Sequence, residues 1–355
     1  MKERMEHIRA ALKDNEAVLI SDGASRFYLT GFPSSAGQVL VTKRGAYFII
    51  DFRYIEKARA TVKTAEVILQ TNTNEQLAEL LARDGATRLY VEAERTPVFD
   101  FDRLALALPA VELARENKID RILTDIRAIK SEEELAMMQA AQDMTDATFS
   151  YILERIEVGR TERDVMLDME FYMRRLGSEG VAFDFIVVSG KNSSLPHGVP
   201  TDKKIERGDF VTMDFGAVFG GYRSDMTRTV AVGCCSDEQK KVYQTVLDAQ
   251  MMAIDFIRPG VSCRDVDRVA RDYIYGAGYE GCFGHGLGHS VGVEIHEMPA
   301  CNQRCETVLK AGTVMTIEPG IYLENRFGVR IEDMIYLGKE KNVNLTHSRK
   351  DLIIL

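Results

Sequence analysis

The sequence predicts an α+β fold in two domains. With 355 residues, the chain is long enough for about two domains of roughly 150 residues each. In the longer, C-terminal part, two helical patterns followed by a group of strand patterns occur twice, over residues 132–232 and again over residues 237–337. This order predicts two similar halves whose sheets pack together. Before residue 118, helical and strand patterns alternate, which predicts a separate, smaller α/β domain.

The small domain is predicted from short elements that follow one another closely. Residues 1–20 are charged, have a helical pattern and lack the apolar core of a signal peptide. The next elements are predicted to be two strands within residues 38–50 around a turn at Lys43–Gly45, a helix at 75–84 and a strand at 88–92. The domain is expected to end near residues 111–117.

The second domain is predicted to begin at a well-marked helix. Ser131 can cap this helix, and Glu134, three residues later, completes a capping box. We therefore place the boundary within residues 118–130 and assign residues 1–124 to the first domain and 125–355 to the second. The predicted elements beyond it are helices at about 132–156, 161–176, 237–257 and 262–275, with strands from 183 to 232 and from 283 to 337.

Composition and charge argue against several classes of protein. A net charge of −9 does not suit a nucleic-acid groove or an anionic membrane surface. The chain contains no uncharged apolar run of about 18 residues, so no transmembrane helix is expected. Its six cysteines form no Cys-X-X-Cys pair, which favours a reduced, cytoplasmic protein.

Two aspartates are predicted to meet on one face of a hairpin formed by residues 210–233. The Gly220–Gly221 pair is a favoured two-residue turn, and it places Asp214 opposite Thr227. Asp225 lies two residues from Thr227 and so shares its face, diagonal to Asp214, where side chains can converge. Solvated aspartates near a turn are the alternative. The apolar neighbours of both residues favour a partly buried sheet instead.

Two glutamates lie within apolar runs near the end of the chain. The strand-like runs are Val314–Ile317 and Val329–Ile331. By period-2 alternation, Thr316 shares a face with Glu318, and Arg330 shares a face with Glu332. Burying these carboxylates is costly unless each is paired, and Arg330 can pair only one of them. Four carboxylates on sheet faces therefore predict divalent cations, two of which would balance their charge.

Three of the six histidines lie in the glycine-rich segment 284–297. In an extended strand, His285 and His289 share one face. His289 and His296 are seven residues apart and need a bend, for which Gly292 is suited. Together with His197 in the loop SLPHGVP, this cluster favours chemistry over packing, whereas His7 and His347 are expected to be ordinary structural residues. Carboxylates with an imidazole suit Mn²⁺, Co²⁺, Fe²⁺ or Zn²⁺.

These residues together resemble the M24 metallopeptidases, in particular the prolidase and aminopeptidase P group. The resemblance covers nearly the whole chain, and it is carried by the motifs MDFGAVFGGYRSDMTRTV, GHGLGHSVGVEIHE, TIEPGIY and GVRIED. The N-terminal motifs GFPSSAG and DFRY resemble the creatinase/prolidase N-terminal domain. The resemblance thus implies a pita-bread catalytic domain preceded by a smaller α/β domain of that type.

The resemblance implies five metal ligands and two divalent ions. Asp214 would chelate one ion, His289 and Glu318 would bind the other, and Asp225 and Glu332 would bridge the two. Manganese is the expected metal, with cobalt, zinc or iron as alternatives.

Further residues match active-site positions of the family. The resemblance implies catalytic roles for His197, His296, Glu318 and Arg330, and substrate binding by His285 and Tyr322. Glu318 would shuttle the proton, and His296 would stabilise the developing oxyanion. The sequence departs from the family at ENRF (324–327) and at Lys191, which both border the site and bear on side-chain preference.

The function that the resemblance implies is hydrolysis of the peptide bond before proline. An Xaa-Pro dipeptidase is the first interpretation, an Xaa-Pro aminopeptidase acting on longer peptides is the alternative, and a non-catalytic pita-bread binding protein is a remote one. Small proline-containing peptides are the expected substrates, and a homodimer is expected. The pattern GAGYEG (276–281) matches a nicotinamide-binding motif, but it follows a predicted helix and no suitable acid lies about 20 residues beyond it.

Overall fold

The computed structural model describes residues 2–355, which form two compact units. The first unit extends to Ile126 and the second comprises Arg127–Leu355. Helix α6 (Lys118–Ala128) contains the point of division. Within residues 2–355, every helix is too short or too polar to cross a membrane.

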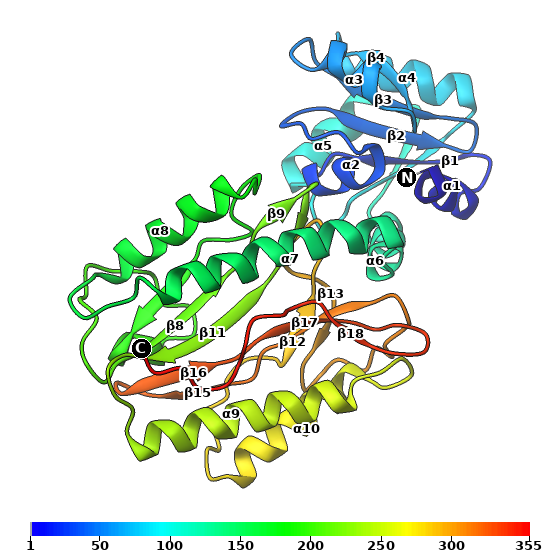
Figure 1. Ribbon diagram of the computed structural model, residues 1–355. Helices are drawn as coiled ribbons and strands as arrows, with labels where there is room; N and C mark the ends of the chain where they lie inside the picture. Colours follow the sequence, from blue (N-terminus) through cyan, green and yellow to red (C-terminus); the bar gives the residue numbers. More distant parts are fainter. Residues whose placement is uncertain (1) are drawn as a thin grey trace. The chain divides into compact units, whose positions relative to one another are not determined.

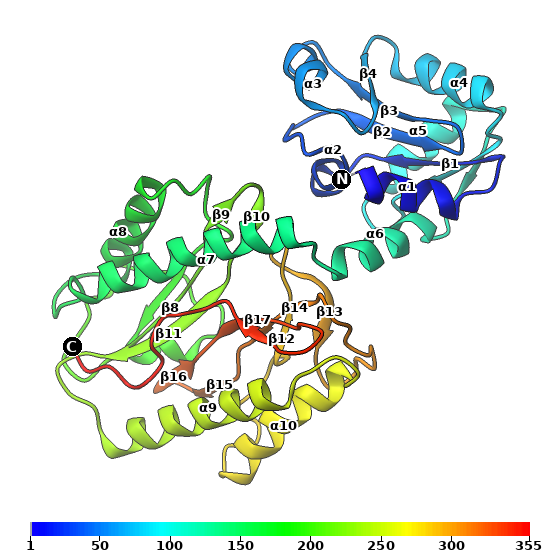
Figure 2. The ribbon, with the colours of Figure 1, turned by 45° about the vertical axis from the view of Figure 1, so that its right-hand side comes forward.

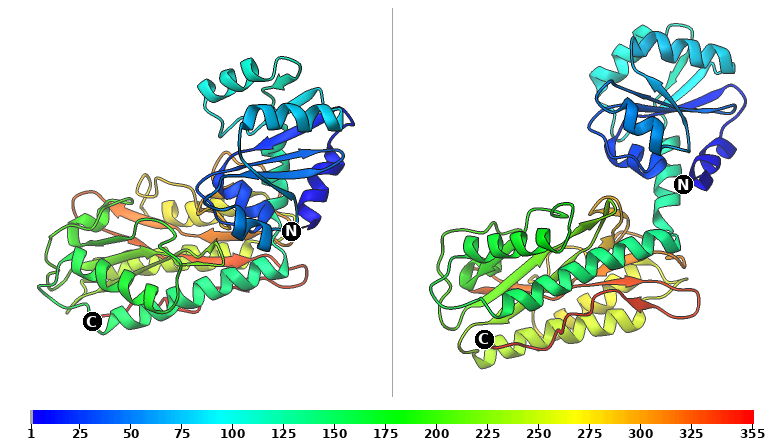
Figure 3. Two further views of the ribbon diagram at one scale, coloured as in Figure 1. Left: turned by 90° about the horizontal axis from the view of Figure 1, so that it is seen from above. Right: turned by 45° about the horizontal axis from the view of Figure 1, so that its top comes forward.

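The first unit is built on a six-stranded mixed sheet with helices against both faces (Figures 1 and 3). The strand order is β4-β3-β2-β1-β5-β6, with β1 (Glu16–Ile20), β2 (Gln38–Thr42), β3 (Ala46–Ile50), β4 (Glu66–Leu69), β5 (Arg88–Val91) and β6 (Glu112–Ala114). The helices that precede α6 are α1 (Lys2–Ala11), α2 (Gly23–Thr30), α3 (Ile55–Thr61), α4 (Thr73–Asp84) and α5 (Val98–Ala107).

The predicted elements of this unit are confirmed except at its start. The strand pair within residues 38–50, the helix at 75–84 and the strand at 88–92 all occur, with ends that differ by one or two residues. The helical prediction for residues 1–20 is wrong beyond Ala11, because Glu16–Ile20 is a strand. All five residues of this strand are buried, since it lies inside the sheet between two others. A strand covered on both faces has no alternating pattern.

The second unit confirms the predicted order of two helices followed by strands, twice. Its helices are α7 (Glu132–Leu153), α8 (Glu162–Arg175), α9 (Asp237–Phe256) and α10 (Cys263–Gly276). Helices α7 and α8 lie on one side of the strands, and α9 and α10 lie on the other (Figures 1 and 2). Each pair of helices packs on its own apolar cluster, so each half has its own core.

The strands of the second unit form several sheets between the helix pairs. The first half contributes β7 (Ile186–Ser189), β8 (Phe210–Phe215) and β11 (Met226–Ala231) in the order β11-β8-β7, and the hairpin β9 (Val218–Phe219) with β10 (Tyr222–Arg223). The second half contributes β12 (Gly288–Ser290), β13 (Glu297–Cys301), β14 (Val314–Ile317), β17 (Asp333–Tyr336) and β18 (Val343–Asn344) in the order β13-β12-β14-β17-β18, and the pair β15 (Gly320–Leu323) with β16 (Phe327–Arg330).

The predicted capping box at the start of α7 is present. The Glu134 amide donates to Ser131 Oγ at 3.3 Å, and the Ser131 amide donates to the Glu134 carboxylate at 2.9 Å. We expect Ser131→Ala to lower the free energy of unfolding by about 1 kcal/mol, because the Glu134 amide in the first turn of the helix loses its acceptor. Urea denaturation followed by circular dichroism measures the change. Ser150→Ala, in the exposed part of the same helix, serves as the control, and equal stability of the two variants would contradict the prediction.

Candidate metal centre

The hairpin that carries the two aspartates has the predicted register. Thr227 is opposite Asp214, and Tyr222 is opposite Phe219 across the glycine turn. Asp225 lies between strands β10 and β11, and its side chain is buried. Both aspartates line one cavity of about 940 Å³ in the second unit.

The two glutamates lie directly after strands rather than within them. Glu318 follows β14, and Glu332 lies between β16 and β17. The prediction that Ile331 belongs to a strand is wrong, because β16 ends at Arg330. Here the chain changes partners: the Glu332 amide donates to the Thr227 carbonyl of the first half at 3.1 Å. Both glutamates line the same cavity.

The histidine segment bends at the predicted place. Strand β12 ends at Ser290, the Gly292 amide bonds to the Glu294 carbonyl at 3.0 Å, and the chain returns along β13. This brings the rings of His289 and His296 into an edge-to-face contact, with centroids 4.5 Å apart. Gly288 is required for the approach of β12 to β14, because a Cβ atom there would lie 1.9 Å from the Thr316 carbonyl oxygen.

The donor atoms of both halves converge. His289 Nε2 lies 3.3 Å from Glu318 Oε1 and 3.6 Å from Asp225 Oδ2. Donor atoms of Asp225, His289 and Glu332 all lie within 4.8 Å of one another. Every one of the five predicted ligands therefore lines one cavity, with Asp214 and Asp225 from the first half and His289, Glu318 and Glu332 from the second.

This arrangement concentrates negative charge away from water. Burial raises the pKa of Glu318 to about 8, and Asp214 adds to the effect. Burial and neighbouring carboxylates also raise the pKa values of Asp225 and Glu332 well above their ordinary range. One oxygen of Asp214 is buried without a hydrogen-bond partner. A bound cation would favour the charged form of such carboxylates.

The protonation state of His289 also suits metal binding. Burial and the nearby His296 lower the pKa of His289 to about 4, so the ring is neutral at physiological pH. Its Nδ1 lies 3.1 Å from the Ser290 carbonyl oxygen, which places the proton on Nδ1 and leaves the Nε2 lone pair directed at the carboxylates. Four carboxylates and one imidazole nitrogen are donors that fit divalent first-row metals.

Two threonines that the sequence analysis did not assign to the site orient the carboxylates. Thr316 Oγ1 accepts from the His289 amide and donates to Glu318 at 3.3 Å. Thr227 Oγ1 donates to Glu332 at 2.7 Å. Period-2 alternation had placed Thr316 beside Glu318, and the glycine turn had placed Thr227 opposite Asp214, so the signal for both was in the sequence.

The arginine has a different partner from the one expected. Arg330 pairs with neither Glu318 nor Glu332. Instead, its Nη2 donates to Asp214 Oδ2 at 2.6 Å. Glu332 is already bonded to a threonine, and the guanidinium extends across to the first half. Arg330 Nη1 also donates to the Pro196 carbonyl, next to His197, at 3.1 Å.

The remaining predicted residues lie around the cavity in different ways. His197, His285, His296 and Arg330 line it. Tyr322 does not belong to the cavity wall. Its hydroxyl is bonded to His285 Nε2 at 2.9 Å and to Arg330 Nη1 at 2.7 Å. Burial lowers the pKa of His285 to about 4 and raises that of Tyr322 to about 12.

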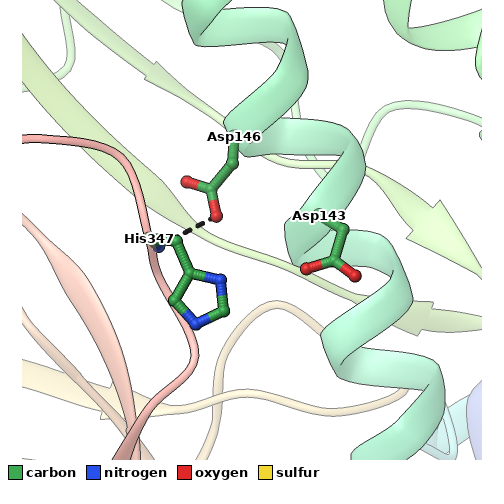
Figure 4. A group of neighbouring side chains, drawn as sticks. All are labelled: Asp143, Asp146 and His347. Carbon is green, nitrogen blue, oxygen red and sulfur yellow. Dashed lines mark hydrogen bonds between the residues drawn. The ribbon is translucent and has the colours of Figure 1, made fainter.

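A second group of two aspartates and a histidine lies elsewhere in the second unit. Asp143 and Asp146 come from α7, and His347 comes from the C-terminal segment (Figure 4). The Asp146 carboxylate accepts from the His347 and Ser348 amides, both at 2.9 Å, and from the Ser348 hydroxyl. These bonds attach the C-terminal segment to α7, and Asp143 and His347 are exposed. This group is therefore structural, as expected for His347.

Comparison with known proteins gives matches over both units. Residues 136–339 match the metallopeptidase family M24, and residues 4–129 match the creatinase/prolidase N-terminal domain. The Xaa-Pro dipeptidase of Pyrococcus horikoshii is 36% identical over 99% of each chain. The structure of an Xaa-Pro dipeptidase from Bacillus anthracis superposes with a TM-score of 0.95 at 39% identity, covering 99% of each chain. That of an X-Pro aminopeptidase from Thermotoga maritima gives 0.91 at 34% identity, covering 98% of this chain and all of that one.

Proposed function

Because the chain belongs to metallopeptidase family M24, we propose that it is an Xaa-Pro dipeptidase, which cleaves the bond before proline in dipeptides. The observation that supports this most is the convergence of five donor side chains on one cavity. The fold is the expected one, a pita-bread catalytic domain after a creatinase/prolidase-type N-terminal domain. We assign the chemistry to the second domain, residues 125–355.

The proposed centre holds two divalent ions, with Mn²⁺ as the expected metal. Asp214, Asp225, His289, Glu318 and Glu332 would hold these ions. Two divalent ions would together carry four positive charges and so offset the four carboxylates. The single guanidinium of Arg330 carries only one. When bound, such ions lower the pKa of water and polarise a carbonyl group.

The chain's own groups supply proton transfer and orientation. Glu318 accepts a proton from the attacking water and passes it to the leaving proline nitrogen. His296, against His289, donates to the carbonyl oxygen as negative charge develops on it. Arg330 fixes Asp214 and the loop that presents His197, while His285 binds the substrate and Tyr322, which lies behind it outside the cavity wall, orients the His285 ring.

An Xaa-Pro aminopeptidase is the second candidate, because a solved relative with that activity in its name resembles the chain almost as closely as the dipeptidases do. Incubation with Ala-Pro and with Ala-Pro-Ala separates the two. We expect proline to be released from the dipeptide, with little cleavage of the tripeptide. Cleavage of the tripeptide alone would identify the aminopeptidase, and cleavage of neither, with no bound metal, would favour a binding protein.

Metal content, assembly and location remain predictions of the proposal. Elemental analysis of the purified protein is expected to give about two divalent ions per chain, as a dinuclear site requires. We propose a homodimer, which light scattering after size-exclusion chromatography would detect, and a cytoplasmic location.

A further inference from the structure

Three buried charged side chains lie beside the segment that carries His289 and His296. They are those of Arg127, Lys130 and Glu297, which we call the clamp. The Lys130 side chain is 1% exposed, that of Glu297 4%, and that of Arg127 10%. Buried charges are costly unless they are paired and hydrogen-bonded, so the partners of these three side chains are important.

Both oxygens of the Glu297 carboxylate are held by the two cations. Arg127 Nε and Nη2 donate to Oε1 at 3.1 and 2.6 Å, and Lys130 Nζ donates to Oε2 at 3.0 Å. Burial acts against ionisation, but Lys130 and Arg127 together lower the pKa of Glu297 to about 2. The carboxylate is therefore charged at neutral pH.

The clamp involves the residues that directly follow both histidines, because it contacts one of them and contains the other. Ser290 follows His289, and its hydroxyl accepts from Lys130 Nζ at 3.1 Å. Glu297 follows His296 and pairs with Ser290 across β12 and β13, at an irregularity in the register. The backbone positions of both histidines are thus tied to one ammonium and one carboxylate.

The loop between the histidines is folded around the same carboxylate. Glu297 Oε1 also accepts from the Glu294 amide at 3.2 Å. At Gly292, a Cβ atom would lie 2.6 Å from both carboxylate oxygens, so only glycine lets the loop approach this closely. The loop has no helix or strand of its own, and its shape depends on this charged contact.

We propose that Arg127 and Lys130, acting through Glu297, are positioning residues that set the placement of His296 relative to His289. The inference rests on the proposed function, in which His289 binds metal and His296 contacts the substrate carbonyl. Neither Arg127 nor Lys130 lines the cavity. Their effect reaches the site through the backbone of residues 290–297.

A matched pair of variants tests the proposal. Lys130 donates to a serine hydroxyl, a backbone carbonyl and a carboxylate. Lys203 donates to the same three kinds of group, Ser189, the Lys204 carbonyl and Asp209, without contacting the histidine segment. Lys130→Met and Lys203→Met therefore lose the same kinds of bond, although Lys203 is the more exposed of the two.

We expect Lys130→Met to weaken Mn²⁺ binding, or to lower kcat for Ala-Pro, by about 10- to 100-fold, as for residues that orient metal ligands. The KM should change little, because no contact with substrate is removed. Lys203→Met should retain both properties. Titration calorimetry of chelator-treated protein measures Mn²⁺ binding independently of turnover. If the wild-type protein binds Mn²⁺ but does not cleave Ala-Pro, the proposed function fails while the calorimetric comparison still tests the clamp.

Two further variants separate positioning from general damage. Lys130→Met/Glu297→Gln should recover part of the loss, because the double variant removes the negative charge together with the ammonium that had balanced it. If Lys130→Met does not fold, Ser290→Ala removes one bond of the same ammonium and should still weaken Mn²⁺ binding. Wild-type metal affinity and kcat in Lys130→Met, or in Ser290→Ala where it takes its place, would overturn the proposal. Equal losses in Lys203→Met would do the same.

Discussion

Replacement of Asp225 or His289 by alanine is expected to abolish turnover while the chain stays folded. Asp225 is the aspartate that we assign to both ions, and His289 Nε2 lies 3.6 Å from Asp225 Oδ2 and 3.3 Å from Glu318 Oε1. Loss of a single group that stabilises developing charge already lowers kcat by about 10²–10³-fold, and a metal ligand should cost at least as much. Release of proline from Ala-Pro measures turnover, circular dichroism measures folding, and elemental analysis measures bound metal.

The second aspartate and histidine group provides the control for this experiment. Asp143→Ala and His347→Ala alter the same residue types at exposed positions outside the cavity, and they should retain full activity. Near-normal activity in purified Asp225→Ala or His289→Ala would remove the basis of the proposed centre. Inactive control variants would show that alanine substitution in this unit has effects unrelated to metal.

Removal of metal by a chelator should abolish activity and also reverse the usual pH dependence of stability. Burial raises the pKa of Glu318 from 4.5 to about 8 in the metal-free fold. Between these two values the folded chain binds a proton that the unfolded chain has released. Raising the pH through this interval therefore destabilises the folded state, by up to about 1.4 kcal/mol per pH unit for each such group.

Other buried carboxylates do not obscure this effect. The cations around Glu297 lower its pKa to about 2, so it loses stabilising charge only below its ordinary range. Two histidines oppose the effect at lower pH, because burial lowers the pKa values of His285 and His289 to about 4 and the unfolded chain then binds protons below about pH 6.5 that the folded chain does not. The melting temperature of metal-free protein is thus expected to fall between pH 6.5 and pH 8, and saturating Mn²⁺ should remove the slope by taking the place of the protons. A metal-free melting temperature that is constant or rises over this interval would contradict the prediction.

The parts of the site that the sequence predicted depend on local geometry. A two-residue glycine turn fixes the register of the hairpin, so the meeting of Asp214 and Asp225 follows from counting residues. The bend at Gly292 likewise follows from the seven-residue spacing of His289 and His296. The capping box at the start of α7 needs only a serine and a glutamate three residues apart.

The parts that could not be predicted depend on contacts between distant segments. Lys130 and Glu297 are separated by 167 positions, and no local pattern links them. The sequence analysis allowed Arg330 to pair with one of the two glutamates, but its partner Asp214 comes from the other half of the unit. The end of β16 at Arg330 also reflects a contact between distant segments. Beyond Arg330, the Glu332 amide is hydrogen-bonded to the other half of the unit.

The five donor side chains are divided between the two halves of the second unit, with two in one half and three in the other. Neither half alone contains the complete set, although each has its own apolar core. The proposed centre can therefore form only when both halves have folded against each other. We therefore expect metal retention to report on assembly, because a mutation at the seam between the halves would separate the donor side chains even where each half keeps its own helices and strands.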